Sequence, residues 1–331
     1  MVLEVYDIET LSNLFTYTGY SIYEKEYYQF IIHNSRNDYI KLIKHLKRNK
    51  LLMIGFNNEN FDYPIIHHLI NHFHEYKNLS GDELSKKIYK KAQDVISQEF
   101  TAIADYNKFI PQLDLFKIWH FDNKAKYTRL KDLEVALKLE LVEDMPIEHN
   151  QYVFEKDISL VLNYNKNDVY ATTKFFLTTL GKTDLSLYQN KNKIELRQKV
   201  EKKYGLKCLN YNDIKLGTEL ILKLYCNKTK KNPKEVNKLR TYRPIINLGD
   251  CLPKWTNFES NEFLSLVDSF KQTNIYNGIT KDVFSYSLIY NGIRIDYGTG
   301  GAHASIKSGI YNSDDDYIIL DLDIDLTHWV N

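Results

Sequence analysis

The sequence predicts an α/β protein in which a mixed sheet is flanked by helices. Strand patterns fill most of the first 56 residues, and helical patterns dominate residues 60–180. Three strands, a helix, a strand and then further helices is an α/β order. The chain has 331 residues, of which 43% are hydrophobic and 26% are charged. This length and composition predict two ordered domains and a fragment of a third.

Five segments of the first 120 residues have strand character. Residues 2–9, V-L-E-V-Y-D-I-E, alternate with a period of two, which predicts a strand. Residues 16–23 and 27–33 are rich in Tyr, Ile and Phe, which favour strands. Residues 51–56 form a compact apolar run and predict a fourth strand. A further strand or edge segment is expected at residues 113–119.

Helical periodicity predicts the other elements of the first 181 residues. A short helix is expected over residues 38–47. A longer helix is expected from about residue 60, where apolar side chains recur every four positions. Residues 75–110 are charged and helical in period, and we interpret them as an insertion. Two more helices are expected over residues 130–137 and 158–177.

The chain beyond residue 181 is expected to form two further regions. Residues 185–243 are helical in pattern, and residues 245–283 are irregular. From residue 283, Tyr, Ile and Gly alternate as in hairpins, and the chain ends in the strand-like I-I-L-D-L-D-I-D. The predicted domains are residues 1–181, a basic helical and irregular linker over 182–282, and a β-rich fragment over 283–331.

The net charge of +1 hides an uneven distribution. Residues 182–243 contain 17 Lys and Arg against 6 Asp and Glu, a net of +11, so the rest of the chain carries −10. An acidic part joined to a basic part is typical of a metal-dependent nuclease with an arm that holds nucleic acid. A solvated lysine-rich helical surface explains the same pattern equally well.

The sequence indicates neither export nor membrane insertion. The first residues are acidic and strand-like, unlike a signal peptide. No run of about 18 apolar residues is present. The three cysteines, Cys208, Cys226 and Cys251, form no C-x-x-C pair, which argues against structural zinc and a disulfide framework. We expect a cytoplasmic protein without a membrane partner.

Three short motifs carry candidate catalytic residues. On a strand, residues i and i+2 share a face, so Asp7 and Glu9 point the same way. Burying two carboxylates together is costly unless cations or donors compensate. The stretch G-F-N-N-E-N-F-D places Asp62 after the fourth strand, where a helix N-cap is the simpler reading. The stretch Y-N-K-N-D places Tyr164 and Asp168 on one helix face, a spacing also common in surface pairs.

Taken in order, D-x-E, N-x-x-x-F-D and Y-x-x-x-D resemble the DEDDy family of 3′–5′ exonucleases, specifically the proofreading domains of DNA polymerases. The resemblance covers residues 1–181 and implies a ribonuclease-H-like fold. It also implies that Asp7, Glu9, Asp62 and Asp168 bind two Mg²⁺ or Mn²⁺ ions, with Asp7 bridging both. Two ions about 3.5–4 Å apart bind the attacking water, the leaving oxygen and the developing phosphorane charge.

The resemblance extends to a water-orienting tyrosine and to substrate contacts. A related subclass has histidine at the position of Asn163, so the resemblance favours the tyrosine subclass, in which Tyr164 orients the water. Thr10, Asn57 and Phe61 match positions that hold a frayed 3′ end in related polymerases. Phe61 either stacks on a base or anchors its helix to the sheet.

Two other motifs give weaker signals. A family segment that reads Ser/Thr-Leu corresponds here to R-L, so Arg129 replaces the small hydroxyl and the role of Leu130 stays open. His68 and His72 have the i, i+4 spacing of zinc ligands. The sequence lacks the Glu beside His68 that the H-E-x-x-H pattern requires, so a partly exposed helix face is expected instead.

The glycine-rich segment 289–311 resembles the connection before the palm of family B phage polymerases, although an ordinary hairpin is the alternative. Asp321, Asp323 and Asp325 fall where the first catalytic aspartate of the palm is expected. The following L-T-H-W-V-N departs from the family pattern, and the fingers and thumb have no room. We therefore expect no polymerase activity from this chain alone. A truncated polymerase, an interrupted gene product and half of a split enzyme all remain open.

The sequence thus predicts a two-metal 3′–5′ exonuclease acting on a single-stranded DNA 3′ end or a primer–template, as the proofreading part of a phage-type polymerase. A separate polymerase palm chain is a candidate partner. One alternative is a stand-alone exonuclease that trims DNA or RNA with the same site. The other is a non-catalytic DNA-binding or split-polymerase subunit.

Overall fold

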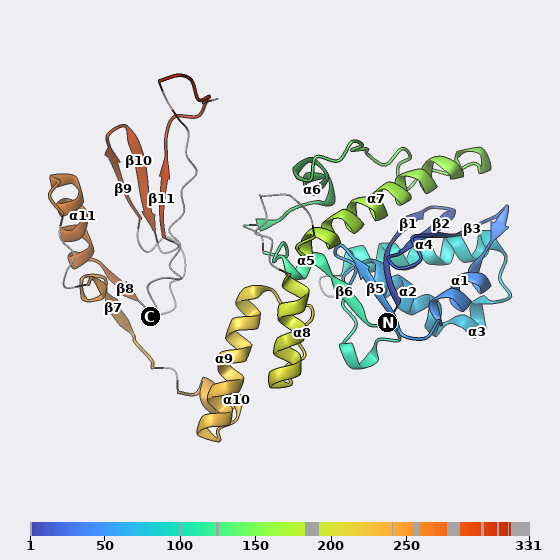
Figure 1. Cartoon of the computed structure of the whole chain (residues 1–331), viewed down its shortest axis with the longest axis horizontal. Coiled ribbons are helices and arrows are strands. Elements are labelled where there is room, and N and C mark those ends of the chain that lie inside the picture. Colours follow the sequence, from blue (N-terminus) through green and yellow to red (C-terminus); the bar gives the residue numbers. More distant parts are fainter. Residues whose placement is uncertain are drawn as a thin grey trace. The chain divides into compact units, whose positions relative to one another are not determined.

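A mixed sheet of six strands organises the first of two units, Met1–Pro233 and Lys234–Asn331 (Figure 1). The computed structural model describes residues 2–98, 101–123, 126–182, 192–239, 241–253, 258–276, 285–298, 301–309, 311–316 and 318. The strands are β1 (Val2–Leu11), β2 (Leu14–Ser21), β3 (Tyr27–His33), β4 (Arg36–Asn37), β5 (Leu51–Gly55) and β6 (Gln112–Asp114). Their order is β4-β3-β2-β1-β5-β6, antiparallel from β4 to β1 and parallel from β1 to β6. The predicted α/β class with a mixed sheet is confirmed.

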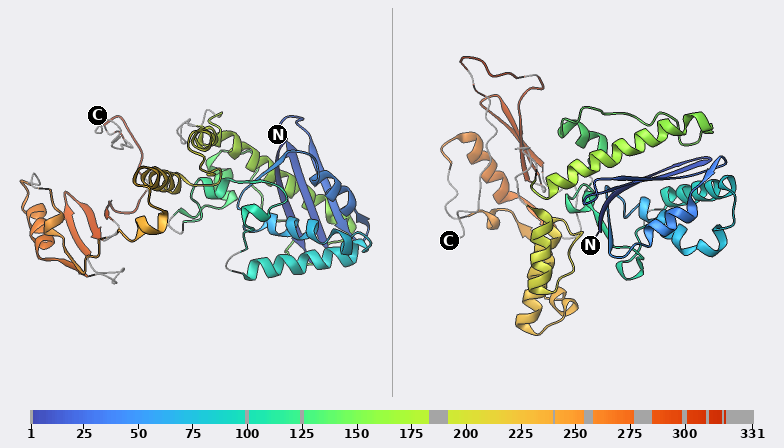
Figure 2. Two further views of the ribbon diagram at one scale, coloured as in Figure 1. Left: turned by 90° about the horizontal axis from the view of Figure 1, so that it is seen from below. Right: turned by 45° about the vertical axis from the view of Figure 1, so that its right-hand side comes forward.

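Helices cover both faces of this sheet. The helices of the first unit are α1 (Tyr39–Leu46), α2 (Asp62–Asn71), α3 (Phe73–Tyr76), α4 (Gly81–Ser97), α5 (Leu115–Ile118), α6 (Leu130–Ala136), α7 (Ile158–Thr179), α8 (Lys193–Tyr204) and α9 (Asp213–Thr229). In the right-hand view of Figure 2, α7 lies on one side of the sheet and α1, α2 and α4 lie on the other. Tyr6 and Ile8 pack into the core on the α1–α2–α4 side, whereas Val5 packs into the core that contains Val169 of α7. Because strand side chains alternate, the odd-numbered residues of β1 face α7.

One of two notable segments differs from the sequence prediction, and the other agrees with it. Residues 113–119 are not one strand, because β6 ends at Asp114 and the chain turns directly into α5. The Asp114 carboxylate accepts a hydrogen bond from the Phe116 N–H at 3.0 Å, which caps this short helix. The helical pattern within residues 75–110 is confirmed by α4, whose start is fixed by a capping box between Ser80 and Glu83.

The second unit combines short strands with one amphipathic helix. Its elements are β7 (Ile245–Asn247), α11 (Asn261–Gln272), β8 (Asn274–Tyr276), β9 (Ser285–Tyr290), β10 (Ile293–Gly298) and β11 (Gly301–Ser305), and α10 (Pro233–Asn237) begins at the boundary. The prediction of an irregular segment over 245–283 is wrong, since α11 forms with Ser260 as its N-cap. The hairpin-like alternation is confirmed by the antiparallel sheet β9-β10-β11. The predicted acidic strand with Asp321, Asp323 and Asp325 lies outside the described residues.

Among the helices described, none is both long and apolar enough to pass through a lipid bilayer.

A buried charge cluster ties β1 to its neighbours on the face opposite α7. The fully buried Glu4 carboxylate accepts hydrogen bonds from the Tyr17 hydroxyl at 2.6 Å, from His45 Nε2 at 2.9 Å and from the Arg48 guanidinium. Burial alone would raise the pKa of Glu4, but these hydrogen bonds and charges outweigh it and lower that pKa below its ordinary value. The cluster therefore holds α1 against the strand that carries the candidate acids.

We expect Glu4→Gln to lower the free energy of unfolding by about 2–4 kcal/mol at neutral pH, because Arg48 loses its buried counter-charge. Urea unfolding measures the change. A carboxyl whose pKa is lowered by folding stabilises the protein above its ordinary pKa, and that contribution is lost as the pH falls. The deficit of the variant should therefore shrink below about pH 4. A deficit that is constant between pH 3 and pH 7 would contradict this assignment.

Candidate metal centre

Three carboxylates from distant parts of the chain meet on the face of the sheet that α7 covers. Asp7 and Glu9 project from β1, and Asp168 projects from α7. Their carboxylate oxygens lie within 4.8 Å of one another. Glu9 and Asp168 are buried, and Asp7 is half-buried. The structure thus brings together acids that are separated by about 160 residues in the sequence.

Asp62 adjoins this group without belonging to it. It is the first residue of α2, and its Oδ1 accepts a hydrogen bond from the Ile8 N–H at 3.3 Å. Ile8 lies between Asp7 and Glu9 in β1, so the Asp62 carboxylate sits against the strand segment that carries both acids. It is 5% exposed. The N-cap role considered from the sequence is not found, because Phe61 precedes the helix and Asp62 is already inside it.

The electrostatics of the site oppose full ionisation. Burial, followed by the charges of Asp62, Glu9 and Asp168, raises the pKa of Asp7 well above its usual range. Burial and the charges of Asp168 and Asp62 do the same for the pKa of Glu9. Burial raises the pKa of Asp62 to about 7 and also raises the pKa of Asp168, although Lys131 opposes the latter. Ionisation of all four acids is therefore unfavourable unless additional positive charge enters the cluster.

Two residues that contact the cluster carry no recognisable signal in the sequence. Lys131 of α6 places its ammonium 3.1 Å from Asp168 Oδ1 and 3.3 Å from Glu134 Oε1, and it lies 4.6 Å from the ring centroid of Tyr164. Asn165 of α7 donates a hydrogen bond from Nδ2 to Asp7 Oδ2 at 2.5 Å. One ammonium and one amide compensate only part of the negative charge that full ionisation would create.

The donor set fits a hard divalent cation. All of the clustered donors are carboxylate oxygens, which are the ligands that Mg²⁺ and Mn²⁺ prefer. Carboxylates that raise one another's pKa gain the most from a bound cation, because the ion offsets the repulsion between them. Asp7, Glu9 and Asp168 would hold such an ion, with Asp62 next to them.

Tyr164 lies one helical turn before Asp168 on α7. Burial, then the charges of Asp168, Glu9 and Asp7, raises the pKa of Tyr164 above its ordinary value, and a hydrogen bond to Asp168 adds to the effect. Tyr164 therefore keeps its proton at neutral pH.

A buried aspartate braces the turn that leads from β5 to Asp62. The carboxylate of Asp114 accepts hydrogen bonds from the N–H of Asn57 at 2.9 Å and of Glu59 at 3.3 Å. Asn57 has a φ of +60°, a left-handed conformation that asparagine tolerates. Gly55 is required beside it, because a Cβ there would lie 2.6 Å from the Cβ of Asn58. Local patterns did not reveal this brace, since its partners are 57 residues apart.

The predicted substrate residues line two hollows next to the acids. A hollow of about 310 Å³ is lined by Asp7, Asp62 and Asn57. Arg129 and Leu130, the weaker candidates of the R-L motif, line the same hollow. Another hollow has a volume of about 530 Å³ and is lined by Glu9, Thr10, Phe61, Tyr89, Gln93, Ile96, His149 and Asn150. Glu9 and Phe61 line both hollows, which connects the acids with the larger space.

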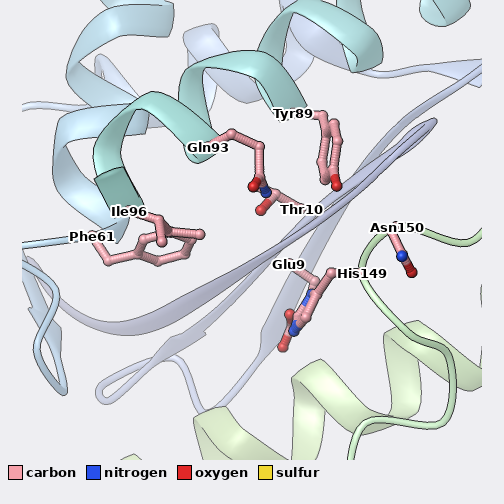
Figure 3. Close-up of a pocket in the computed structure, with 8 residues that line it drawn as sticks. All are labelled: Glu9, Thr10, Phe61, Tyr89, Gln93, Ile96, His149 and Asn150. Atoms are coloured by element: carbon pink, nitrogen blue, oxygen red, sulfur yellow. The ribbon is translucent and has the colours of Figure 1, made fainter. Parts of the chain in front are cut away.

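The larger hollow has a helix on one side and a loop on the other. Figure 3 shows Tyr89, Gln93 and Ile96 pointing from α4 toward β1, with His149 and Asn150 on the opposite loop. Ser12 fixes this loop, because its N–H donates to the His149 carbonyl at 3.0 Å and its hydroxyl donates to the Gln151 carbonyl at 2.6 Å. Tyr89, Gln93 and Ile96 lie within residues 75–110, the segment interpreted from the sequence as an insertion. This segment therefore forms one wall of the larger hollow, which we call the groove.

His68 and His72 are engaged with protein groups. Their rings pack with centroids 3.9 Å apart. His68 Nε2 is 2.9 Å from the Tyr76 hydroxyl, and His72 Nδ1 donates to the His68 carbonyl at 2.9 Å. Burial lowers the pKa of His68 to about 4. Both side chains are half-buried, in line with the expected helix face.

Comparison of the chain with protein families, curated proteins and solved structures finds no match. The functional assignment therefore depends on the geometry described above and on the sequence motifs.

Proposed function

We propose that this chain is a divalent-metal-dependent 3′–5′ exonuclease with a ribonuclease-H-like fold, which removes nucleotides from single-stranded DNA 3′ ends. The observation that carries the proposal is the convergence of Asp7, Glu9 and Asp168, whose oxygens lie within 4.8 Å of one another. Asp62 and Tyr164 border the same group. Carboxylate clusters of this kind serve phosphoryl-transfer enzymes that use two divalent ions.

In this proposal, some residues of the chain bind the divalent ions and another orients the water or a phosphate oxygen. When bound, divalent ions would supply the positive charge that makes water nucleophilic and offsets the charge developing on the phosphate. Asp7, Glu9 and Asp168, with Asp62 beside them, would hold that charge in place. Tyr164 keeps its proton, so it acts as a hydrogen-bond donor that orients water or a phosphate oxygen and not as a base.

The dimensions and lining of the groove next to Glu9 favour a single-stranded substrate. Its volume of about 530 Å³ lies between α4 and a fixed loop, a space suited to unpaired nucleotides and not to a duplex. Phe61 and Tyr89 provide aromatic rings on which bases stack, with each stacked base contributing about 1–3 kcal/mol. Thr10 and Gln93 add polar groups beside them. These features favour an end that has frayed from its complement.

Degradation of a 5′-labelled oligonucleotide tests the proposal. With Mg²⁺ or Mn²⁺ we expect a ladder of products shortened from the 3′ end, and with EDTA no products. Asp168→Ala should abolish the ladder while binding of the oligonucleotide in Ca²⁺ persists. An RNA oligonucleotide of the same sequence decides whether DNA is preferred. Intact oligonucleotide in both metals, or equal degradation by Asp168→Ala, would refute the proposal.

We expect Tyr164→Phe to lower the rate of nucleotide release by about 10- to 100-fold, less than loss of an acid, because water can still reach the metal. Binding of Mn²⁺ should stay within about threefold of the parent, since the phenol is not a metal ligand. Single-turnover rates and calorimetric Mn²⁺ titration measure the two effects. An unchanged rate would remove Tyr164 from the proposed site.

The proposal extends to a role as the proofreading part of a phage-type DNA polymerase. The order of the three motifs and the glycine-rich segment near residue 300 support it. A primer–template with a mismatched 3′ end should then be shortened faster than a matched one. A separate polymerase palm chain is a candidate partner in this role.

A further inference from the structure

The outer edge of β6 is covered by a side chain. β6 is the last strand in the sheet order, with β5 as its neighbour among the described strands. Asn210, in the loop between α8 and α9, accepts a hydrogen bond at Oδ1 from the Asp114 N–H at 2.9 Å. Its Nδ2 donates to the Gln112 carbonyl at 2.9 Å. These are the two groups that a neighbouring strand would bind, so the amide of Asn210 imitates one peptide unit.

The same amide also reaches the turn between β5 and α2. Asn210 Nδ2 lies 3.0 Å from Glu59 Oε1 and donates to it. The other carboxylate oxygen of Glu59 accepts from Lys117 at 2.7 Å, and Lys108 completes the ion cluster. Glu59 is 5% exposed. A residue of the helical arm, here residues 192–233, is thus bonded to the turn that precedes Asp62.

Asn210 and Asp114 hold this turn from two sides. The Asp114 N–H is bound by Asn210, and the Asp114 carboxylate binds the N–H of Asn57 and of Glu59. The Glu59 side chain is bound by Asn210 directly. A shift of the end of β6 therefore moves the backbone of the turn, and with it Asn57 and Asp62.

We propose that Asn210 is a positioning residue, through which the helical arm sets the conformation of the turn that carries Asn57 and Asp62. Its effect on nucleotide release rests on the proposed function, whereas its effect on the turn does not. The arm then has a role beyond offering basic charge to a nucleic-acid strand.

Asn210→Ala tests this, with Asn212→Ala as the matched control. Asn212 lies in the same loop and also contacts the body of the unit, through His120 at 2.9 Å, and it caps α9 at the Lys215 N–H. It has no hydrogen bond to β6 or to Glu59 among the described residues. Hydrogen–deuterium exchange in EDTA, read on peptides that cover residues 57–59, reports on the turn without requiring activity.

We expect exchange over residues 57–59 to be at least about tenfold faster in Asn210→Ala and unchanged in Asn212→Ala. We expect kcat for nucleotide release to fall about tenfold with KM within about threefold, because the turn carries groups that must be placed accurately. Asn210→Asp keeps the acceptor for the Asp114 N–H but places a carboxylate against Glu59 Oε1 and the Gln112 carbonyl, so exchange over residues 57–59 should again be faster than in the parent. This variant preserves the side-chain volume if the alanine variant fails to fold.

Unchanged exchange over residues 57–59 in both Asn210 variants would overturn the inference. Equal acceleration in Asn212→Ala would do so too, because it would show that general loosening of the arm is responsible. If the parent releases no nucleotides in Mg²⁺ or Mn²⁺, the proposed function fails, and the exchange comparison still decides the role of Asn210.

Discussion

Asp7→Asn is expected to abolish metal-dependent nucleotide release and, in EDTA, to make the protein more stable than the parent. The fall in rate should be at least about a thousandfold, which corresponds to roughly 4 kcal/mol of transition-state stabilisation. The gain in stability follows from the raised pKa of Asp7. Burial and the neighbouring carboxylates disfavour its ionised form, and asparagine carries no charge. Asn165 can still donate its hydrogen bond to the new side chain.

The pH dependence of unfolding in EDTA tests the stability effect. A carboxyl whose pKa is raised by folding holds its proton more firmly in the folded state, so stability is lost as the pH rises toward and through the folded pKa. We expect the melting temperature of the parent to fall between pH 5 and pH 8 and that of Asp7→Asn to fall less. Glu26→Gln removes one charge from an exposed turn and serves as the control. A melting temperature of Asp7→Asn below that of the parent at pH 8 would contradict the prediction.

Lys131→Met is expected to destabilise the protein in EDTA by about 2–4 kcal/mol, because it leaves Asp168 and Glu134 without their shared cation. Glu134 is fully buried and Asp168 nearly so. Addition of Mn²⁺ should recover much of the loss, since an ion bound at Asp168 compensates the same carboxylate and stabilises only the folded state. Urea unfolding with and without Mn²⁺ measures both effects.

Lys86→Met is the matched control for this substitution. Lys86 pairs with Asp82 at 2.7 Å on the exposed side of α4, where an ion pair contributes little. Its unfolding should match that of the parent with and without Mn²⁺. If Lys131→Met behaves like Lys86→Met, Lys131 does not neutralise the acidic cluster.

Local sequence patterns predicted the elements of the sheet, and the resemblance to the DEDDy exonucleases implied that the acids converge. The alternation of V-Y-D-I-E was sufficient to place Asp7 and Glu9 on one face of a strand, and the structure has them there. Helical spacing likewise placed Tyr164 and Asp168 together on α7. The helix α11 was also predictable, because Phe263, Leu266 and Phe270 recur at helical spacing after the capping Ser260. The metal-binding role of the acids and the catalytic role of Tyr164 stay predictions.

Contacts between distant segments were beyond the reach of those patterns. Lys131 meets Asp168 across 37 residues, and Asn165 meets Asp7 across 158. Asn210 reaches Asp114 across 96 residues. A lysine on a short helix or an asparagine in a loop carries no periodic signal, and only the packing of the elements decides which partner it meets. For this reason, residues that contact the acids from distant segments are harder to predict than the acids themselves.

The strand β1 carries two different polar clusters on its opposite faces. Glu4 is hydrogen-bonded to His45 of α1, and Asp7 and Glu9 face α7. Deleting one residue between Glu4 and Asp7 would invert every side chain on one side of the deletion. Either the carboxylates would enter the hydrophobic layer or Glu4 would leave its partners. We infer that this stretch is intolerant of the insertion or deletion of a single residue, even where substitutions of its apolar residues are accepted.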